Sequence, residues 1–133
     1  MNELSADDRL AIIHVICDFT HMVDNQDFDR IGDVFTEDFH YDRSNLGAPD
    51  VDGHDGVRAS LQGKVAFNHL STDICIRGPE GDGVGVDSKF FAFLRDGTLA
   101  TGAIHDVVVR TDLGWRLSRR CATPRHAGTF PTS

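Results

Sequence analysis

Two polar side chains far apart in the sequence, Asp24 and His69, have the chemistry of a general base and of the carboxylate that orients it. A neutral imidazole removes a proton best when its second ring nitrogen donates a hydrogen bond to a carboxylate. That bond selects the tautomer and stabilises the cation that forms. If the two side chains meet inside an apolar pocket, the pair acts on a small molecule there.

The position of Asp24 depends on a long helix that is expected over residues 6–24. Ser5 is suited to cap its N-terminus, and the segment combines a wide apolar arc with a narrow polar stripe at roughly 100° per residue. Asp24 lies on the side of Cys17, which belongs to the arc. We therefore expect Asp24 to be buried and to need a partner. The alternative is that the helix ends there and that residues 24–27 form a solvated turn.

The polar stripe of the same helix carries His14, Asp18 and His21 at spacings of four and three residues. Such a row could present two imidazoles and a carboxylate to a metal ion. A solvated helix face explains the same residues, and the chain has no HExxH, HxH or CxxC motif and no Gly-rich phosphate loop that opens a helix. We expect neither a metal nor another cofactor.

The composition limits the partners of the protein. The chain has 133 residues, with 13 basic and 21 acidic side chains and a formal net charge of −8, which argues against nucleic-acid or membrane binding and favours a small uncharged or cationic ligand. Its length predicts a single domain over residues 1–133. A polar, acidic N-terminus and the lack of a long apolar run predict a cytoplasmic protein. Three widely separated cysteines are expected to be small buried hydrophobes, namely Cys17, Cys75 and Cys121.

The second half of the chain is expected to be β-structure. Apolar residues there alternate with a period of two, and Gly- and Asp-containing turns separate the segments. Before them, a short helix is expected after Asp27, a short strand at Phe39 to Tyr41, and a third helix that Gly63 closes. Helices followed by strands predict an α+β domain with a mostly antiparallel sheet curled around the first helix. The predicted strands are residues 65–77, 84–95, 98–110 and 115–122.

The Asp-Gly pair between the second and third of these strands predicts a two-residue hairpin loop, which would pair Arg95 with Thr98. In that register Phe90 and His105 share the more apolar face of the sheet. The opposite face, which includes Asp106, mixes apolar and charged residues, and we expect a homodimer through it. A single β-bulge would invert part of this assignment.

The sequence resembles a known family in three places. The run FTHMVDNQDFDRIGDVFTED, residues 19–38, resembles the end of the first helix and the second helix of SnoaL-like proteins of the nuclear-transport-factor-2-like superfamily. The segments NHLSTD and GAIHDVVVRTDLGWRLSRR resemble the middle and last strands of that family. The resemblance implies a cone-shaped α+β barrel whose sheet wraps the first helix around a deep apolar pocket, commonly in a dimer.

Members with this layout include scytalone dehydratase, a hexachlorocyclohexane dehydrochlorinase and ketosteroid isomerase, together with many non-catalytic binding domains. In the dehydratase and the dehydrochlorinase, an Asp at the end of the first helix orients a His that removes a proton. Those positions match Asp24 and His69. Two tyrosines of the dehydratase fall at Val23 and Arg43 here, so the match does not extend to its mode of dehydration.

The resemblance thus implies a cofactor-independent lyase or isomerase that acts on a small, apolar, carbonyl-bearing or polycyclic molecule. A further group must stabilise the negative charge that develops on the substrate. Tyr41, His105, Arg43 and Arg120 are the candidates for that role. The substrate-binding set predicted around Asp24 and His69 consists of these four residues with Phe19, Phe67 and Phe90.

Three alternatives remain open at this point. The chain can be a small-molecule-binding or accessory domain without catalysis. It can also be an enzyme whose base is another acid, Asp42 or Asp106, as in ketosteroid isomerase. Finally, Ile74 and Ile76 have the opposite parity to His69 along their strand, so His69 would face solvent if these isoleucines face the core.

Overall fold

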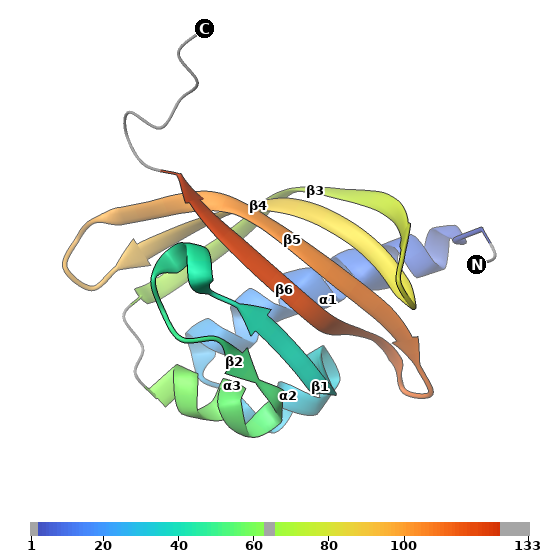
Figure 1. The fold of residues 1–133 in the computed structure, drawn as a ribbon, viewed down its shortest axis with the longest axis horizontal. Helices are drawn as coiled ribbons and strands as arrows, with labels where there is room; N and C mark the ends of the chain where they lie inside the picture. The colour runs from blue at the N-terminus through green and yellow to red at the C-terminus, as the bar shows by residue number, and fades with distance from the viewer. Residues whose placement is uncertain (1–2, 63–65, 126–133) are drawn as a thin grey trace, which may run out of the picture.

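The computed structural model describes residues 3–62 and 66–125 of the chain (Figure 1). The long helix α1 (Ala6–Asn25) begins with a capping box: Ser5 Oγ accepts a hydrogen bond from the Asp8 amide at 3.0 Å, and an Asp8 carboxylate oxygen accepts one from the Ser5 amide at 3.1 Å. The helix ends at Asn25, and the capping residue Gln26 has a left-handed backbone and an amide that donates back to the carbonyls of Met22 and Val23. The predicted helix is confirmed to within one residue at its C-terminal end.

This capping box leads to a stability prediction. Replacing Ser5 by alanine removes the acceptor for the Asp8 amide and should lower the free energy of unfolding by about 1 kcal/mol. Ser5→Thr, which keeps a hydroxyl at the cap, is the matched control and should lose less. Urea unfolding measures both variants, and equal losses would show that the hydroxyl is not what stabilises the helix end.

Short elements connect α1 to the main sheet. Two of the short helices, Ile31–Val34 and Gly53–Gln62, lie near the C-terminal end of α1 (Figure 1). Asp27 precedes the first short element without making a side-chain capping bond. The strand predicted at Phe39 to Tyr41 begins four residues earlier, and the predicted closing residue Gly63 lies outside the described residues. In chain order the elements are η1 (Phe28–Arg30), α2 (Ile31–Val34), β1 (Phe35–Asp42), η2 (Ser44–Leu46), β2 (Val51–Asp52) and α3 (Gly53–Gln62).

The four long strands form an antiparallel meander, as the period of two predicts. They are β3 (Ala66–Glu80), β4 (Gly83–Leu94), β5 (Leu99–Thr111) and β6 (Gly114–Arg125). The sheet order is β2-β1-β6-β5-β4-β3, in which only the β1–β6 pairing is parallel. The sheet curves across α1 and is not closed (Figure 1). The α+β prediction is confirmed. None of the helices in the described ranges is long and apolar enough to cross a membrane.

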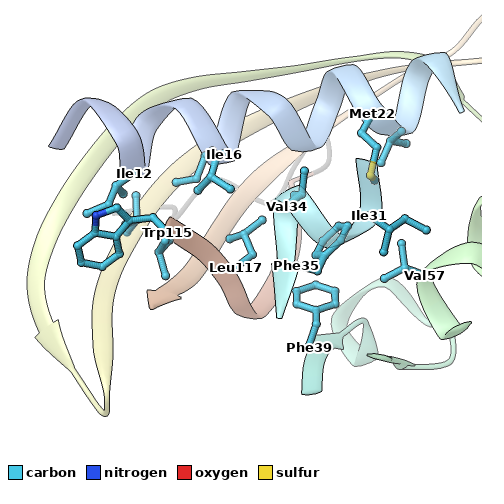
Figure 2. Packing of buried hydrophobic residues seen from close by; sticks show 14 of the residues in the cluster. Ile12, Ile16, Met22, Ile31, Val34, Phe35, Phe39, Val57, Trp115 and Leu117 are labelled. Atoms are coloured by element: carbon cyan, nitrogen blue, oxygen red, sulfur yellow. The ribbon is translucent and has the colours of Figure 1, made fainter. Parts of the chain in front are cut away.

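The main core lies between the apolar arc of α1 and the elements that face it (Figure 2). The rings of Phe35 and Phe39 of β1 pack at a tilt with centroids 4.4 Å apart, and both side chains are buried. Their packing holds β1 against the helices and so sets the wall on which Tyr41 lies. Other members of this core include Ile12, Ile16, Met22, Ile31, Val34, Val57, Trp115 and Leu117.

The β4–β5 hairpin departs from the predicted register. The Leu94 amide donates to the Thr98 carbonyl at 2.9 Å, and Gly97 has a φ of +87°, so the loop has three residues rather than two. One extra residue turns every side chain of β5 to the other face. His105 therefore pairs with Asp87 on the outer face, and Asp106 points into the core. The predicted faces of β5 were wrong for this reason.

A bulge in β3 decides which way His69 points. The register with β4 shifts between Thr72 and Cys75, and Asp73 between them has a φ of +53°. Before the bulge His69 pairs with Ala92, and after it Ile76 pairs with Val86; Ala92 and Val86 are both buried on the inner face. The bulge therefore lets His69 and Ile76 share the inner face although their parity differs.

The cysteines do not follow the prediction. Cys75 comes directly after the bulge, pairs with Asp87 and is exposed, whereas Cys17 and Cys121 are partly buried. All three are free thiols. The expectation of three buried residues was wrong, because Cys75 lies on the outer face opposite Asp87 and the other two thiols are only partly covered.

Candidate active site

The last turn of α1 and the first part of β3 bring Asp24 and His69 into contact. His69 Nδ1 lies 2.6 Å from Asp24 Oδ1, and the His69 amide donates to Asp24 Oδ2 at 2.7 Å. The side chains are 25% and 14% exposed. The carboxylate favours hydrogen on Nδ1, which leaves the lone pair of a neutral imidazole on Nε2. The hydrogen bond from the His69 backbone amide also fixes the carboxylate against β3. Both oxygens of Asp24 are therefore bound to His69.

His69 lies in the wall of a cavity of about 580 Å³, which we call the front cavity. This size is within the range of roughly 300–1,000 Å³ that is usual for small-molecule sites. Apolar and aromatic side chains make up most of the wall, among them Phe19, Val23, Phe35, Phe39, Val51, Val57, Phe90, Ala92 and Ile104. The polar side chains in the wall are Thr20, Tyr41, Arg43, Asn45, Ser60, His69, Ser71 and Arg120.

Five residues of the predicted substrate-binding set lie in this wall together with His69: Phe19, Tyr41, Arg43, Phe90 and Arg120. Two predicted members lie elsewhere.

His105 is on the outer face, 44% exposed, because of the longer hairpin loop. Phe67 is also exposed, and its ring packs against Phe93 at 6.3 Å beside a register shift between Ala66 and Asn68. The structure therefore removes His105 and Phe67 from the front cavity.

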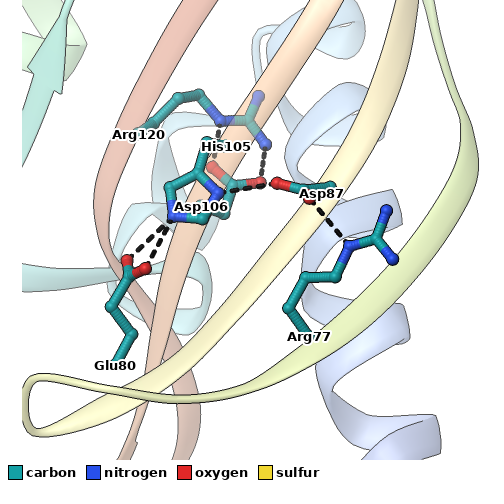
Figure 3. A network of polar contacts seen from close by, with 6 residues as sticks. All are labelled: Arg77, Glu80, Asp87, His105, Asp106 and Arg120. Atoms are coloured by element: carbon teal, nitrogen blue, oxygen red, sulfur yellow. Dashed lines mark hydrogen bonds and ion pairs between the residues drawn. The ribbon is translucent and has the colours of Figure 1, made fainter.

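Arg120 enters the front cavity as a buried cation. Its Nε and Nη2 donate to the two carboxylate oxygens of Asp106 at 2.8 and 2.9 Å, and the two side chains are 3% and 0% exposed. Its guanidinium lies 3.9 Å from the centroid of the Phe19 ring. Within the described part of the chain Nη1 donates no hydrogen bond, and Figure 3 shows it turned away from Asp106. Arg120 thus has a donor left for a ligand.

Burial affects the protonation of the groups beside Arg120. It raises the pKa of the Tyr41 hydroxyl, a shift that the charge of Arg120 only partly offsets, so Tyr41 remains a hydrogen-bond donor at neutral pH. Burial also raises the pKa of the Asp106 carboxyl, and the charge and hydrogen bonds of Arg120 oppose that shift. Arg120 and Tyr41 are therefore two donors in the same wall.

The comparison with known proteins agrees with this architecture. Residues 4–121 match the model of the SnoaL-like domain. The chain belongs to the SnoaL-like family. No curated protein sequence matches this SnoaL-like protein.

Solved structures match it over almost its whole length. A candidate aromatic ring hydroxylase from Novosphingobium aromaticivorans has 29% sequence identity and a TM-score of 0.79, with 98% of this chain and 95% of that chain covered. A cystatin-like-fold, NTF2-like protein from the same organism has 21% identity and a TM-score of 0.78, with 92% and 85% covered. A candidate scytalone dehydratase from that organism has 22% identity and a TM-score of 0.72, with 97% and 94% covered. The last two likenesses show the fold.

The alternative bases of this SnoaL-like protein are engaged elsewhere. Asp106 is held by Arg120, and Asp42 accepts hydrogen bonds from the amide and hydroxyl of Ser44 at 2.9 and 2.6 Å. These bonds lower the pKa of Asp42. Neither carboxylate is part of the front cavity wall, so His69 is the basic group that the wall presents together with a carboxylate partner.

In the polar stripe of α1, Asp18 forms a buried ion pair, whereas His14 and His21 are exposed. Asp18 is buried, and Arg30 Nη1 donates to its Oδ1 at 2.8 Å while Nη2 donates to Oδ2. His14 lies 3.9 Å from Asp18 and is exposed. Within residues 3–62 and 66–125 no group of three or more His, Cys, Asp or Glu side chains is arranged to hold a metal ion.

Sequence reasoning missed some polar residues of the wall. Thr20, Ser60 and Ser71 line the front cavity, but hydroxyl residues occur throughout the chain and no motif marks these three. Ser71 had one usable signal, because it lies two residues after His69 and shares its strand face before the bulge.

The contacts of His105 on the outer face predict that the stability of the protein depends on pH. Its Nδ1 lies 2.7 Å from Asp87 and its Nε2 2.8 Å from Glu80 (Figure 3), and these bonds raise its pKa. A raised pKa in the folded state means that the stabilisation is complete below the unfolded value of about 6.5 and is lost as the pH rises through the folded value. His105→Gln should therefore lower the melting temperature more at about pH 6 than at about pH 9.

The effect is expected to be small, roughly 0–1 kcal/mol, because His105 is exposed to screening solvent. Thermal unfolding of the wild type and the variant in matched ionic strength measures it. The same difference in melting temperature at both pH values would refute the charged pairing of His105.

Proposed function

We propose that the protein is a cofactor-independent lyase or isomerase in which His69 is the general base and Asp24 orients it. The main support is the bond between His69 Nδ1 and Asp24 Oδ1 at the wall of the front cavity. The likeness to a candidate scytalone dehydratase is in keeping with this class of reaction.

In the proposed reaction, His69 Nε2 takes a proton from a carbon next to the carbonyl group of the substrate. The electrons of that C–H bond form the C=C bond of an enolate, and the negative charge collects on the carbonyl oxygen. Arg120 Nη1 and the Tyr41 hydroxyl are the donors proposed to stabilise this oxygen, and they act strongly because water is scarce around them. The enolate is then protonated at another carbon, or it expels a leaving group from the β-carbon.

The substrate that fits this proposal is small, largely apolar, and carbonyl-bearing or polycyclic. Aromatic rings such as Phe19 and Phe90 supply flat apolar surface in the wall, and the polar groups of the wall are few. The acidic net charge of the chain does not favour a polyanionic substrate.

Proton abstraction can be measured without the natural substrate. 1-Indanone is a small bicyclic ketone whose α-protons exchange slowly with D2O, and NMR follows the loss of their signal. We expect the wild-type protein to accelerate this exchange well above buffer alone. A protein that binds 1-indanone but does not accelerate the exchange would instead be a ligand-binding domain without catalysis, which is the alternative function.

We also propose that two copies of the chain associate through the outer face of β3, β4 and β5. Exposed apolar residues gather there, and Phe67 packs on Phe93. Nearby charges, such as Lys89 with Asp73, are already paired within one chain, so the same face can meet itself without like-charge repulsion. Sedimentation equilibrium tests this, and a monomer at all concentrations would reject it.

A further inference from the structure

A second cavity of about 300 Å³, which we call the back cavity, lies between α1 and β3. Asp24 lines the back cavity but not the front one, whereas His69 lines both. His69 therefore borders both spaces, which adjoin along Thr20, His69, Leu70 and Ser71. The wall of the back cavity consists of Cys17, Thr20, His21, Asp24, Asn25, Asn68, His69, Leu70 and Ser71.

The two spaces differ in chemical character. The front cavity is bounded mainly by aromatic and aliphatic side chains, while most of the side chains around the back cavity are polar. A water molecule takes up about 30 Å³ in the liquid and needs two to four polar partners, so the back cavity has room and partners for several waters. An apolar substrate is expected to occupy the front cavity, and water the back cavity.

A base that removes a proton must lose it before the next turnover, unless it returns the proton to the substrate. An apolar substrate that fills the front cavity displaces water from that side of His69. The back cavity remains in contact with the same residue, and the exposed His21 lies on its wall. Water held by the polar wall of the back cavity can therefore hydrate the imidazolium while the front cavity is occupied.

We propose that the back cavity is a water-filled route by which His69 releases its proton to solvent, with His21 beside the solvent end. The proposal rests on the proposed function of His69 as a base. In this step the Nε2–H bond of the imidazolium breaks and the proton passes to a water molecule, which gives up a proton to the next water or to His21. The imidazole returns to its neutral form with hydrogen on Nδ1, facing Asp24, and no other reactant is consumed.

This route narrows the class of reaction. A proton that leaves through the back cavity does not return to the substrate, so the site favours eliminations and other reactions that lose the substrate proton to solvent. A leaving group would depart through the front cavity. An isomerisation that carries the same proton from one carbon to another would have no use for the route.

Cys17 offers a way to close the back cavity without changing the front wall, because it lines only the former. In a Cys75→Ser, Cys121→Ser protein, benzyl methanethiosulfonate attaches a benzylthio group at Cys17 alone. The measured quantity is the rate at which the Nε2 proton of protonated His69 exchanges with water, followed by NMR in histidine-labelled protein with saturating 1-indanone in the front cavity. The signal is assigned by its loss in His69→Gln. We expect the attached group to slow this exchange at least about tenfold.

The matched control is a Cys17→Ser, Cys121→Ser protein that carries the same group on the exposed Cys75, and its exchange rate should not change. His21→Trp, a substitution at an exposed position, is a second means of obstructing the back cavity should modification at Cys17 unfold the protein. Equal exchange rates with the back cavity open and obstructed would overturn the proposal. The measurement needs bound 1-indanone but no turnover, so its outcome is independent of whether the protein accelerates the α-proton exchange of 1-indanone.

Discussion

Replacing His69 by alanine is expected to slow the α-proton exchange of 1-indanone by about 10²–10⁴-fold relative to the wild type. The imidazole is the only proposed proton acceptor in the front cavity wall, and alanine has no group that can take its place. The variant should keep its melting temperature within a few degrees, because His69 is a quarter exposed and contributes little to the core. Circular dichroism and the NMR exchange assay together measure both quantities.

Asp24→Asn tests the proposal that Asp24 orients His69. An amide cannot hold the Nδ1 tautomer as a carboxylate does, so the exchange rate should also fall by at least about tenfold. His105→Ala is the matched control. This imidazole is also hydrogen-bonded to carboxylates, those of Asp87 and Glu80, but it lies on the outer face. A loss of activity in His105→Ala, or full activity in His69→Ala, would contradict the assignment of His69 as the base.

The largest effect on stability is expected from Asp106→Asn. This change removes the charge that pairs with the buried guanidinium of Arg120, and leaving one buried charge unpaired typically costs about 3–5 kcal/mol. Such a loss is a large part of the about 5–15 kcal/mol that stabilises an ordinary domain. Urea unfolding at neutral pH measures the change in free energy.

A double-mutant cycle separates the unpaired charge from the pair itself. Asp106→Leu with Arg120→Met replaces both charges by apolar side chains, and the double variant should be far more stable than the sum of the single losses predicts. The exposed pair Arg77–Asp87 is the control, because breaking it should cost only about 0–1 kcal/mol. Additive losses at Asp106 and Arg120 would show that the two side chains do not stabilise each other.

Much of the architecture was predictable from local sequence. The apolar arc of α1, the capping residue Ser5 and the alternation of the later strands specify helix and strand through neighbouring residues alone. Asp24 was predictable for the same reason, because its side of the helix follows from the period of 3.6. The family motifs added His69 as its partner, and the contact between the two is present.

The partners of the other polar residues were not predictable in this way. The hairpin between β4 and β5 has one residue more in its loop than the Asp-Gly pair suggested, and this single residue exchanged His105 for Asp106 on the inner face. An Asp-Gly pair suits two- and three-residue loops alike, so composition alone does not distinguish them. The ion pair of Asp106 with Arg120 depends on the three-residue loop, because that loop places Asp106 on the inner face.

The sequence by itself determined which segments are helix or strand, their order, and the placement of Asp24 on the buried side of α1. Only the tertiary structure decided that His69 and Ile76 face the same side, because the bulge at Asp73 changes the parity of β3 through its pairing with β4. The physical reason is the distance along the chain over which each feature is decided. Helical and strand periods are properties of adjacent residues, whereas register, bulges and the walls of cavities depend on how distant segments pack together.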